Sequence, residues 1–169
     1  VPPLAGMLLR DKVLLYQHDL AAETWTKNKA MLRWNLAQGY NLSNAFLDAE
    51  RGGLNMDNPW LNLVGVFQKY VLADYVDELV VSYDDLGNNV TRTEFTTYTV
   101  YANWDADKSY VREGYTLPPD GVVTQAHDGL VTAGIFTAYN DQPLSEGEHY
   151  LVEVRSPAAI RIFQPVGAN

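Results

Sequence analysis

The stretch Tyr98-Thr99-Val100-Tyr101-Ala102-Asn103-Trp104 decides the fold of the carboxy-terminal half of this 169-residue chain. Its larger apolar side chains fall at positions 98, 100, 102 and 104, the period of two that puts them on one face of a strand. Similar alternation appears over residues 131–138, 149–155 and 160–163, and turn signals such as Leu86-Gly87-Asn88 separate the runs. About eight short strands with this spacing predict an antiparallel β-sandwich.

The amino-terminal part has a different pattern, in which strand and helix signals alternate. Val13-Leu14-Leu15-Tyr16 is a short apolar run typical of a buried parallel strand. Apolar residues within 30–37 share one helical face, and Gly39 is a helix stop. Residues 40–43 predict a second, very short strand.

A second helix is predicted to begin at Asn58-Pro59, because Asn caps a helix and Pro suits its first turn. It should run to about Asp77, where the composition also changes. Residues 1–77 carry seven basic and eight acidic side chains, whereas residues 78–169 carry five and thirteen. We therefore expect two domains, a strand–helix segment over 1–77 and a β-sandwich over 78–169.

Composition excludes several classes of protein. Apolar residues make up 47% and charged residues 20%, so the chain can bury a core. A net charge of −9 argues against nucleic-acid and anionic-membrane partners. No apolar run approaches the ~20 residues of a membrane helix. The absence of cysteine excludes disulfides and thiolate sites, and it leaves the compartment undetermined.

The sharpest polar cluster is Gln17-His18-Asp19, followed by Glu23. It comes directly after a predicted strand, where barrels and open α/β sheets place their ligand sites. A His beside an Asp there can bind sugar hydroxyls while the carboxylate stabilises an oxocarbenium-like transition state. Alternatively, Asp19 caps the following turn and His18 bonds to a loop carbonyl. Asp19 and Glu23 lie too close along the chain to face each other across a sugar, and they suit a binding rim better than a catalytic pair.

Aromatic residues of the β part are candidate sugar-stacking platforms, with Trp104 the first of them and Tyr101 and Tyr110 beside it. The alternative is that Trp104, in register with Tyr98 and Val100, faces the core.

Metal and cofactor signals are weak. Asp105-Ala106-Asp107-Lys108-Ser109 resembles the start of a calcium loop, but Tyr110 stands where that loop needs Gly. His127 and His149 have no neighbour at metal-ligand spacing. No phosphate-binding glycine loop or zinc-protease motif occurs, and we expect no metal and no cofactor.

Together these residues resemble the end of a glycoside hydrolase of the α-amylase/α-galactosidase type. Leu15-Tyr16-Gln17-His18-Asp19 is similar to the Asn-His-Asp segment after the seventh barrel strand of the α-amylase superfamily, with Gln17 in place of Asn. Residues 36–43 resemble the following helix and eighth strand, and residues 58–70 the closing helix. The remainder looks like the β-sandwich that follows such barrels. The resemblance implies an α/β remnant, the last strand–helix units of a (β/α)₈ barrel, before the sandwich.

The resemblance also implies roles for individual residues. Asp19 would stabilise the transition state, and His18 would contact the sugar with Gln17, Glu23 and Trp104 around it. The nucleophile and the acid/base would come from earlier strands, so we expect the 169-residue chain alone to be inactive. Its partners would be carbohydrate and either the preceding part of the same protein or a second copy.

Two other classes of function stay open. The chain would be a non-catalytic carbohydrate-binding or adhesion module with a helical extension, or a structural protein that docks on a partner through its helices.

Overall fold

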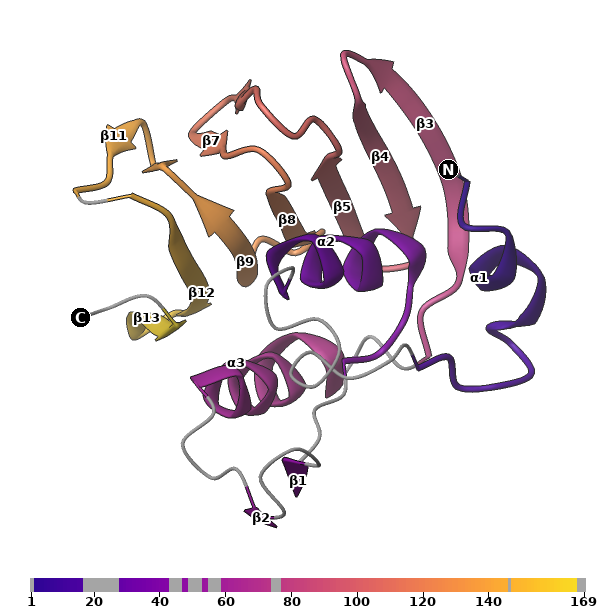
Figure 1. Ribbon diagram of the computed structural model, residues 1–169. Coiled ribbons are helices and arrows are strands. Elements are labelled where there is room, and N and C mark those ends of the chain that lie inside the picture. Colours follow the sequence, from indigo (N-terminus) through magenta and orange to yellow (C-terminus); the bar gives the residue numbers. More distant parts are fainter. Residues whose placement is uncertain are drawn as a thin grey trace.

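The computed structural model describes residues 2–16, 28–42, 47–48, 53–54, 59–73, 77–145 and 147–166. Within them, helices lie on one face of a large antiparallel sheet and a smaller sheet lies on the other (Figure 1). The mainly antiparallel β structure predicted for the second half is confirmed, including strands over 98–103 and 131–136 where the alternation is clearest.

The helical elements are α1 (Leu4–Leu9), α2 (Asn28–Gln38) and α3 (Pro59–Phe67), and α3 continues as the π-helical segment η1 (Gln68–Leu72). Two of these three helices were predicted from the sequence, and α1 was not; Asp77, where the second predicted helix was expected to end, lies in a turn. Helix α2 ends at Gly39, whose φ of +79° is the left-handed conformation that glycine adopts at no steric cost. Helix α3 begins at the predicted Pro59.

Seven antiparallel strands form the large sheet, in the order β13-β12-β9-β8-β5-β4-β3. Their bounds are β3 (Val80–Gly87), β4 (Val90–Phe95), β5 (Tyr98–Asn103), β8 (Val122–Ala126), β9 (Val131–Phe136), β12 (His149–Ser156) and β13 (Ala159–Val166). The smaller sheet, in the order β11-β10-β7-β6, consists of β6 (Tyr110–Arg112), β7 (Tyr115–Leu117), β10 (Ala138–Tyr139) and β11 (Gln142–Pro143). A separate two-stranded ribbon pairs β1 (Leu47–Asp48) with β2 (Gly53–Leu54).

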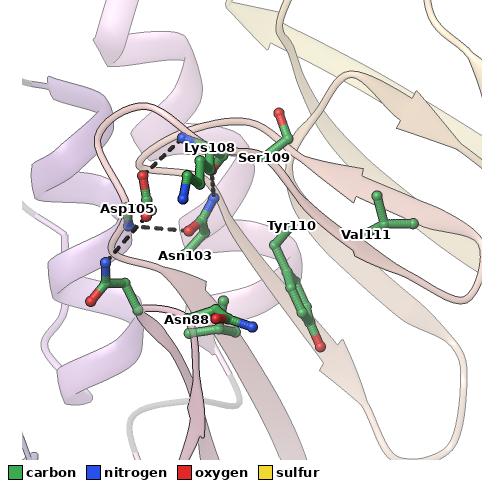
Figure 2. A pocket seen from close by; sticks show the side chains of 9 residues that line it. Asn88, Asn103, Asp105, Lys108, Ser109, Tyr110 and Val111 are labelled. Atoms are coloured by element: carbon green, nitrogen blue, oxygen red, sulfur yellow. Dashed lines mark hydrogen bonds between the residues drawn. The ribbon is translucent and has the colours of Figure 1, made fainter.

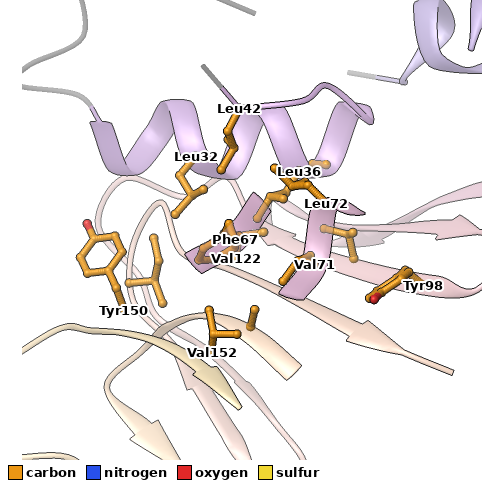
Figure 3. Close-up of a cluster of buried hydrophobic side chains, with 14 of the residues drawn as sticks. Leu32, Leu36, Leu42, Phe67, Val71, Leu72, Tyr98, Val122, Tyr150 and Val152 are labelled. Carbon is orange, nitrogen blue, oxygen red and sulfur yellow. The ribbon is translucent and has the colours of Figure 1, made fainter. Parts of the chain in front are cut away.

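The main core lies between the helices and the large sheet (Figure 3). Leu32 and Leu36 of α2 and Phe67 of α3 are fully buried, and they belong to one cluster with Val100 and Val152 of the sheet. Burying side chains of this size stabilises a fold by ~1.5–3 kcal/mol each. The helices before residue 78 therefore share a hydrophobic core with the strands after it. The predicted two-domain division stays a prediction.

A second core joins the two sheets. It consists of Tyr101, Leu117, Val123, Phe136, Tyr139 and Leu151, which come from both sheets. Because side chains alternate along a strand, Tyr101 points to this core while its neighbours Val100 and Ala102 point to the helices.

The segment Val13–Tyr16 corrects one expectation. The apolar run predicted a buried parallel strand, but Val13, Leu14 and Tyr16 are each at least half exposed. Its pairing is a single parallel bridge between Tyr16 and Asn41, in which the Asn41 amide donates to the Leu15 carbonyl at 2.7 Å. The prediction of burial is wrong here because no described element covers the outer side of this segment.

None of the helices in the described ranges is long and apolar enough to cross a membrane.

Candidate functional site

The sugar-site residues predicted from the sequence, Gln17, His18, Asp19 and Glu23, lie outside the described residues. The structure does describe the residue that comes directly before them in the sequence. This residue, Tyr16, forms a single parallel bridge with Asn41, which lies in the second predicted strand segment. Helix α2 lies between these two residues in the sequence.

Trp104 packs against the main core. This is the second of the two expectations for Trp104, the one based on its register with Tyr98 and Val100. Its indole nitrogen donates to the hydroxyl of Thr91 at 2.8 Å. The guanidinium of Arg33, from α2, lies 4.3 Å from the centre of its ring. One face of the ring is thus occupied by a cation, so the position of Trp104 gives no support to a sugar-stacking role.

Arg33 holds the helix to the end of strand β5. Its guanidinium donates to the Asn103 carbonyl at 3.1 Å and forms an ion pair with Asp120. Burial lowers the pKa of Arg33, and the neighbouring Asp120 carboxylate opposes that shift. We conclude that Arg33, Trp104 and Asp120 form a structural clamp.

A cavity of about 340 Å³ is lined in part by Asn103, whose carbonyl accepts from Arg33 of the clamp (Figure 2). The turn between β3 and β4 forms one wall, and the loop from β5 to β6 forms the other. Its lining residues are Asn88, Asn89, Val90, Asn103, Asp105, Lys108, Ser109, Tyr110 and Val111.

Asn103 fixes the loop wall of the cavity. Its side chain is buried, and its amide donates to the carbonyls of Lys108 at 2.7 Å and Pro118 at 2.9 Å. Its side-chain oxygen accepts a hydrogen bond from the Asp105 backbone at 3.1 Å. The bonds with Lys108 and Asp105 hold one backbone conformation of the loop, and the bond to Pro118 ties Asn103 to the connection between β7 and β8.

Asp105 closes the same loop as an Asx turn. One carboxylate oxygen accepts from the backbone amides of Asp107 at 2.9 Å and Lys108 at 2.8 Å, and the other accepts from Asn89 at 3.2 Å. These hydrogen bonds lower the pKa of Asp105, with a smaller contribution from the Lys108 charge. The segment Asp105–Ser109, which resembled the start of a calcium loop, is therefore a wall of the cavity, and both carboxylate oxygens of Asp105 accept hydrogen bonds within the protein.

Other side chains that line the cavity are not tied into its walls by hydrogen bonds. Among the described residues, the Asn88 amide, the Lys108 ammonium and the hydroxyls of Ser109 and Tyr110 have no hydrogen-bond partner. The Tyr110 ring is half buried against the second core. The turn at Asn88 and the acidic turn at Asp105–Ser109 are visible in the sequence, but only the strand pairing brings them together.

A row of polar side chains crosses the large sheet on the face away from the helices. Strand register aligns Glu94, Thr99, Gln125, Thr132 and Glu153 side by side. At one end of the row, Thr99 donates to Glu94 at 3.1 Å, and the Nε2 atom of His127 lies 2.9 Å from the Glu94 carboxylate. At the other end, Arg155 donates to the buried Glu153 at 2.5 Å.

The two carboxylates of this row do not form a hydrolytic pair. Glu94 and Glu153 are separated by four inter-strand steps of ~4.8 Å, or about 19 Å in all. Glycoside hydrolysis needs carboxyl groups roughly 5–10 Å apart across the scissile bond. Hydrogen bonds and ion pairs engage the two ends of the row, and the half-exposed His127 lies beside Glu94 at one of them.

No group of three or more His, Asp or Glu side chains within the described ranges is arranged to hold a metal ion. Comparison with protein-family models, with curated proteins and with solved structures finds no match to this chain.

Proposed function

We propose that the chain is the carboxy-terminal portion of a carbohydrate-active enzyme, a glycoside hydrolase whose (β/α) barrel ends within residues 1–77. The observation that carries the proposal is the parallel bridge between Tyr16 and Asn41. All strand pairings of the named strands are antiparallel, so this bridge is the one parallel contact in the described part of the chain. Two parallel segments with a helix between them form the repeating unit of such barrels.

The exposed apolar surface around this bridge supports the proposal. Parallel strands are normally buried on both faces, and large exposed apolar patches mark interfaces. Seven large apolar side chains of the first sixteen residues are exposed: Leu4, Met7, Leu8, Leu9, Val13, Leu14 and Tyr16. In the proposed enzyme the preceding barrel strands and helices cover this surface; self-association is the competing explanation.

The proposed chemistry assigns one role to each residue that follows the bridge. Asp19 stabilises the positive charge that develops on the sugar ring, and His18, Gln17 and Glu23 bind its hydroxyls. The nucleophile and the acid/base belong to other strands of the barrel. The isolated 169-residue chain is therefore expected to bind sugar at most and to hydrolyse none.

The test is Asp19→Asn in the native gene product, assayed on chromogenic α- and β-glycosides. We expect kcat to fall by about 10²-fold or more with little change in KM, because a transition-state charge loses its partner. Asp11→Asn is the matched control, since Asp11 is exposed and paired with the neighbouring Lys12. Unchanged turnover in the Asp19 variant would remove Asp19 from the mechanism. A native gene product that hydrolyses none of these glycosides, or one no longer than this chain, would contradict the proposal.

A non-catalytic carbohydrate-binding module is the second candidate, and the cavity beside Asn103 favours it. That cavity is formed entirely by the β part and needs no barrel. Hydrolysis that is abolished in the Asp19→Asn variant would exclude this candidate as a full account of the protein.

A further inference from the structure

We propose that the cavity between the β3–β4 turn and the β5–β6 loop binds one neutral sugar residue (Figure 2). The choice of sugar as the ligand class rests on the proposed function. The existence of a binding cavity rests on the geometry that follows.

The walls of the cavity are held in place before any ligand arrives. Asn103 makes two hydrogen bonds within the loop and one to the Pro118 carbonyl after β7, and the Asp105 carboxylate accepts three more. The bond from Asn89 to Asp105 ties the turn to the loop. A site whose walls are fixed in this way loses little entropy when it binds.

The groups that face the cavity are suited to a polyhydroxylated ring. The Asn88 amide both donates and accepts, the hydroxyls of Ser109 and Tyr110 do the same, and Lys108 donates. These four side chains have no partner among the described residues. Hydroxyl-bearing ligands supply both donors and acceptors to such a set, and the half-buried Tyr110 ring offers an apolar edge.

The size and charge of the cavity restrict the class of ligand further. A volume of about 340 Å³ lies at the lower end of the range of small-molecule sites, which suits one sugar ring. Lys108 and Asp105 carry opposite charges, and residues 78–169 carry an excess of eight negative charges. A neutral sugar is therefore favoured over a uronic acid or a phosphate.

The experiment is titration of the 169-residue chain with neutral mono- and disaccharides at up to about 100 mM, followed by amide shifts in ¹H–¹⁵N spectra. We expect shifts confined to residues 88–90 and 103–111, with weak, millimolar binding. Asn88→Gly should weaken binding by about three- to tenfold, the factor that one lost neutral hydrogen bond corresponds to. Glycine suits this position because Asn88 has a φ of +51°.

Asn140→Gly is the matched control, because Asn140 also has a φ of +51° in an exposed turn but does not line the cavity. It should leave sugar binding unchanged. No shift with any sugar, shifts confined to other residues, or equal loss in both variants would overturn the inference. Binding of inorganic phosphate in preference to every sugar would also overturn it, because the cavity would then be an anion site.

The two proposals fail separately. Hydrolysis by the native gene product with no shifts at the cavity would contradict sugar binding in the cavity and leave the enzyme assignment intact. Cavity shifts together with no hydrolysis by the native gene product would contradict the enzyme assignment alone.

Discussion

The two faces of the seven-stranded sheet are built by the same strands and are covered very differently. On the helical face, Tyr98, Val100 and Ala102 of β5 pack with Leu32 and Phe67 in one apolar core. On the other face, the neighbouring positions Thr99 and Tyr101 belong to a polar row and to the second core, respectively.

The difference follows from what covers each row of residues. The small sheet covers the row that contains Tyr101, Val123 and Leu151, and these residues are apolar and buried. The next row runs from Glu94 to Glu153. Thr99 donates to Glu94, and flanking Arg and His residues pair with the two carboxylates. Gln125 donates to Tyr115 of the small sheet. Alternation along a strand thus fixes which side chains share a face, and on this face the apolar row is the one that packs in the second core with the small sheet.

The helical face should dominate stability, and Phe67→Ala tests this most strongly. Removing this fully buried ring leaves a cavity in the shared core, so we expect a loss of about 3–5 kcal/mol in the free energy of unfolding. Urea denaturation, followed by both tryptophan fluorescence and far-UV circular dichroism, should show one transition that shifts as a whole.

Val111→Ala is the control for this change, since Val111 is 73% exposed on β6 and should alter stability by at most ~0.5 kcal/mol. If Phe67→Ala instead produced two transitions, with the one from the strands unmoved, residues 1–77 and 78–169 would be separate domains as the composition predicted.

The clamp at the end of β5 should have a smaller effect. Arg33→Ala removes a stacked cation, an ion pair and a hydrogen bond to the Asn103 carbonyl, for an expected loss of about 2 kcal/mol. Arg33→Lys should recover only part of it, because an ammonium group cannot stack flat on Trp104. Thermal denaturation of the variants measures both effects.

Lys29→Ala is a matched comparison on the same helix. Lys29 pairs with Glu148 at 2.6 Å, but both side chains are partly exposed, so we expect about 0.5 kcal/mol. Equal losses for Arg33→Ala and Lys29→Ala would mean that stacking on Trp104 adds nothing to the attachment of α2.

Local signals predicted several elements of this fold, although not helix α1. The stop at Gly39, the start at Pro59 and the alternation over residues 98–104 each depend on a few neighbouring residues, and each is confirmed. Val13–Tyr16 was predicted less well, because an apolar run indicates burial without showing which element would cover it.

The candidate sites also differ in whether the sequence could predict them. Gln17, His18, Asp19 and Glu23 were found from their place after a strand, and their roles stay predictions. The cavity was not predicted, because its walls come from two turns that only the pairing of β4 with β5 brings together. The partner of Trp104 was also not predictable, since Arg33 lies about seventy residues earlier in the chain and belongs to another element.

The smallest expected effect concerns the acid stability of the cavity loop. The pKa of Asp105 is lowered in the folded chain, chiefly by hydrogen bonds from the backbone amides of Asp107 and Lys108. A lowered carboxyl pKa stabilises the fold above the unfolded value near pH 4, and this contribution is lost as the pH falls through the folded value. Asp105→Asn should therefore lower the thermal midpoint at pH 7, and its difference from the wild type should shrink between pH 4 and pH 2.

Asn89→Gly is the control for the acid effect, because it removes the side-chain donor to Asp105 and keeps both backbone bonds. Glycine also accepts the φ of +58° at this position. Most of the pH dependence should survive in this variant, since the backbone amides are the larger causes of the shift. A midpoint difference between wild type and Asp105→Asn that is the same at pH 7 and pH 2 would show that the ionised carboxylate does not hold the loop. The cavity wall would then depend on Asn103 alone.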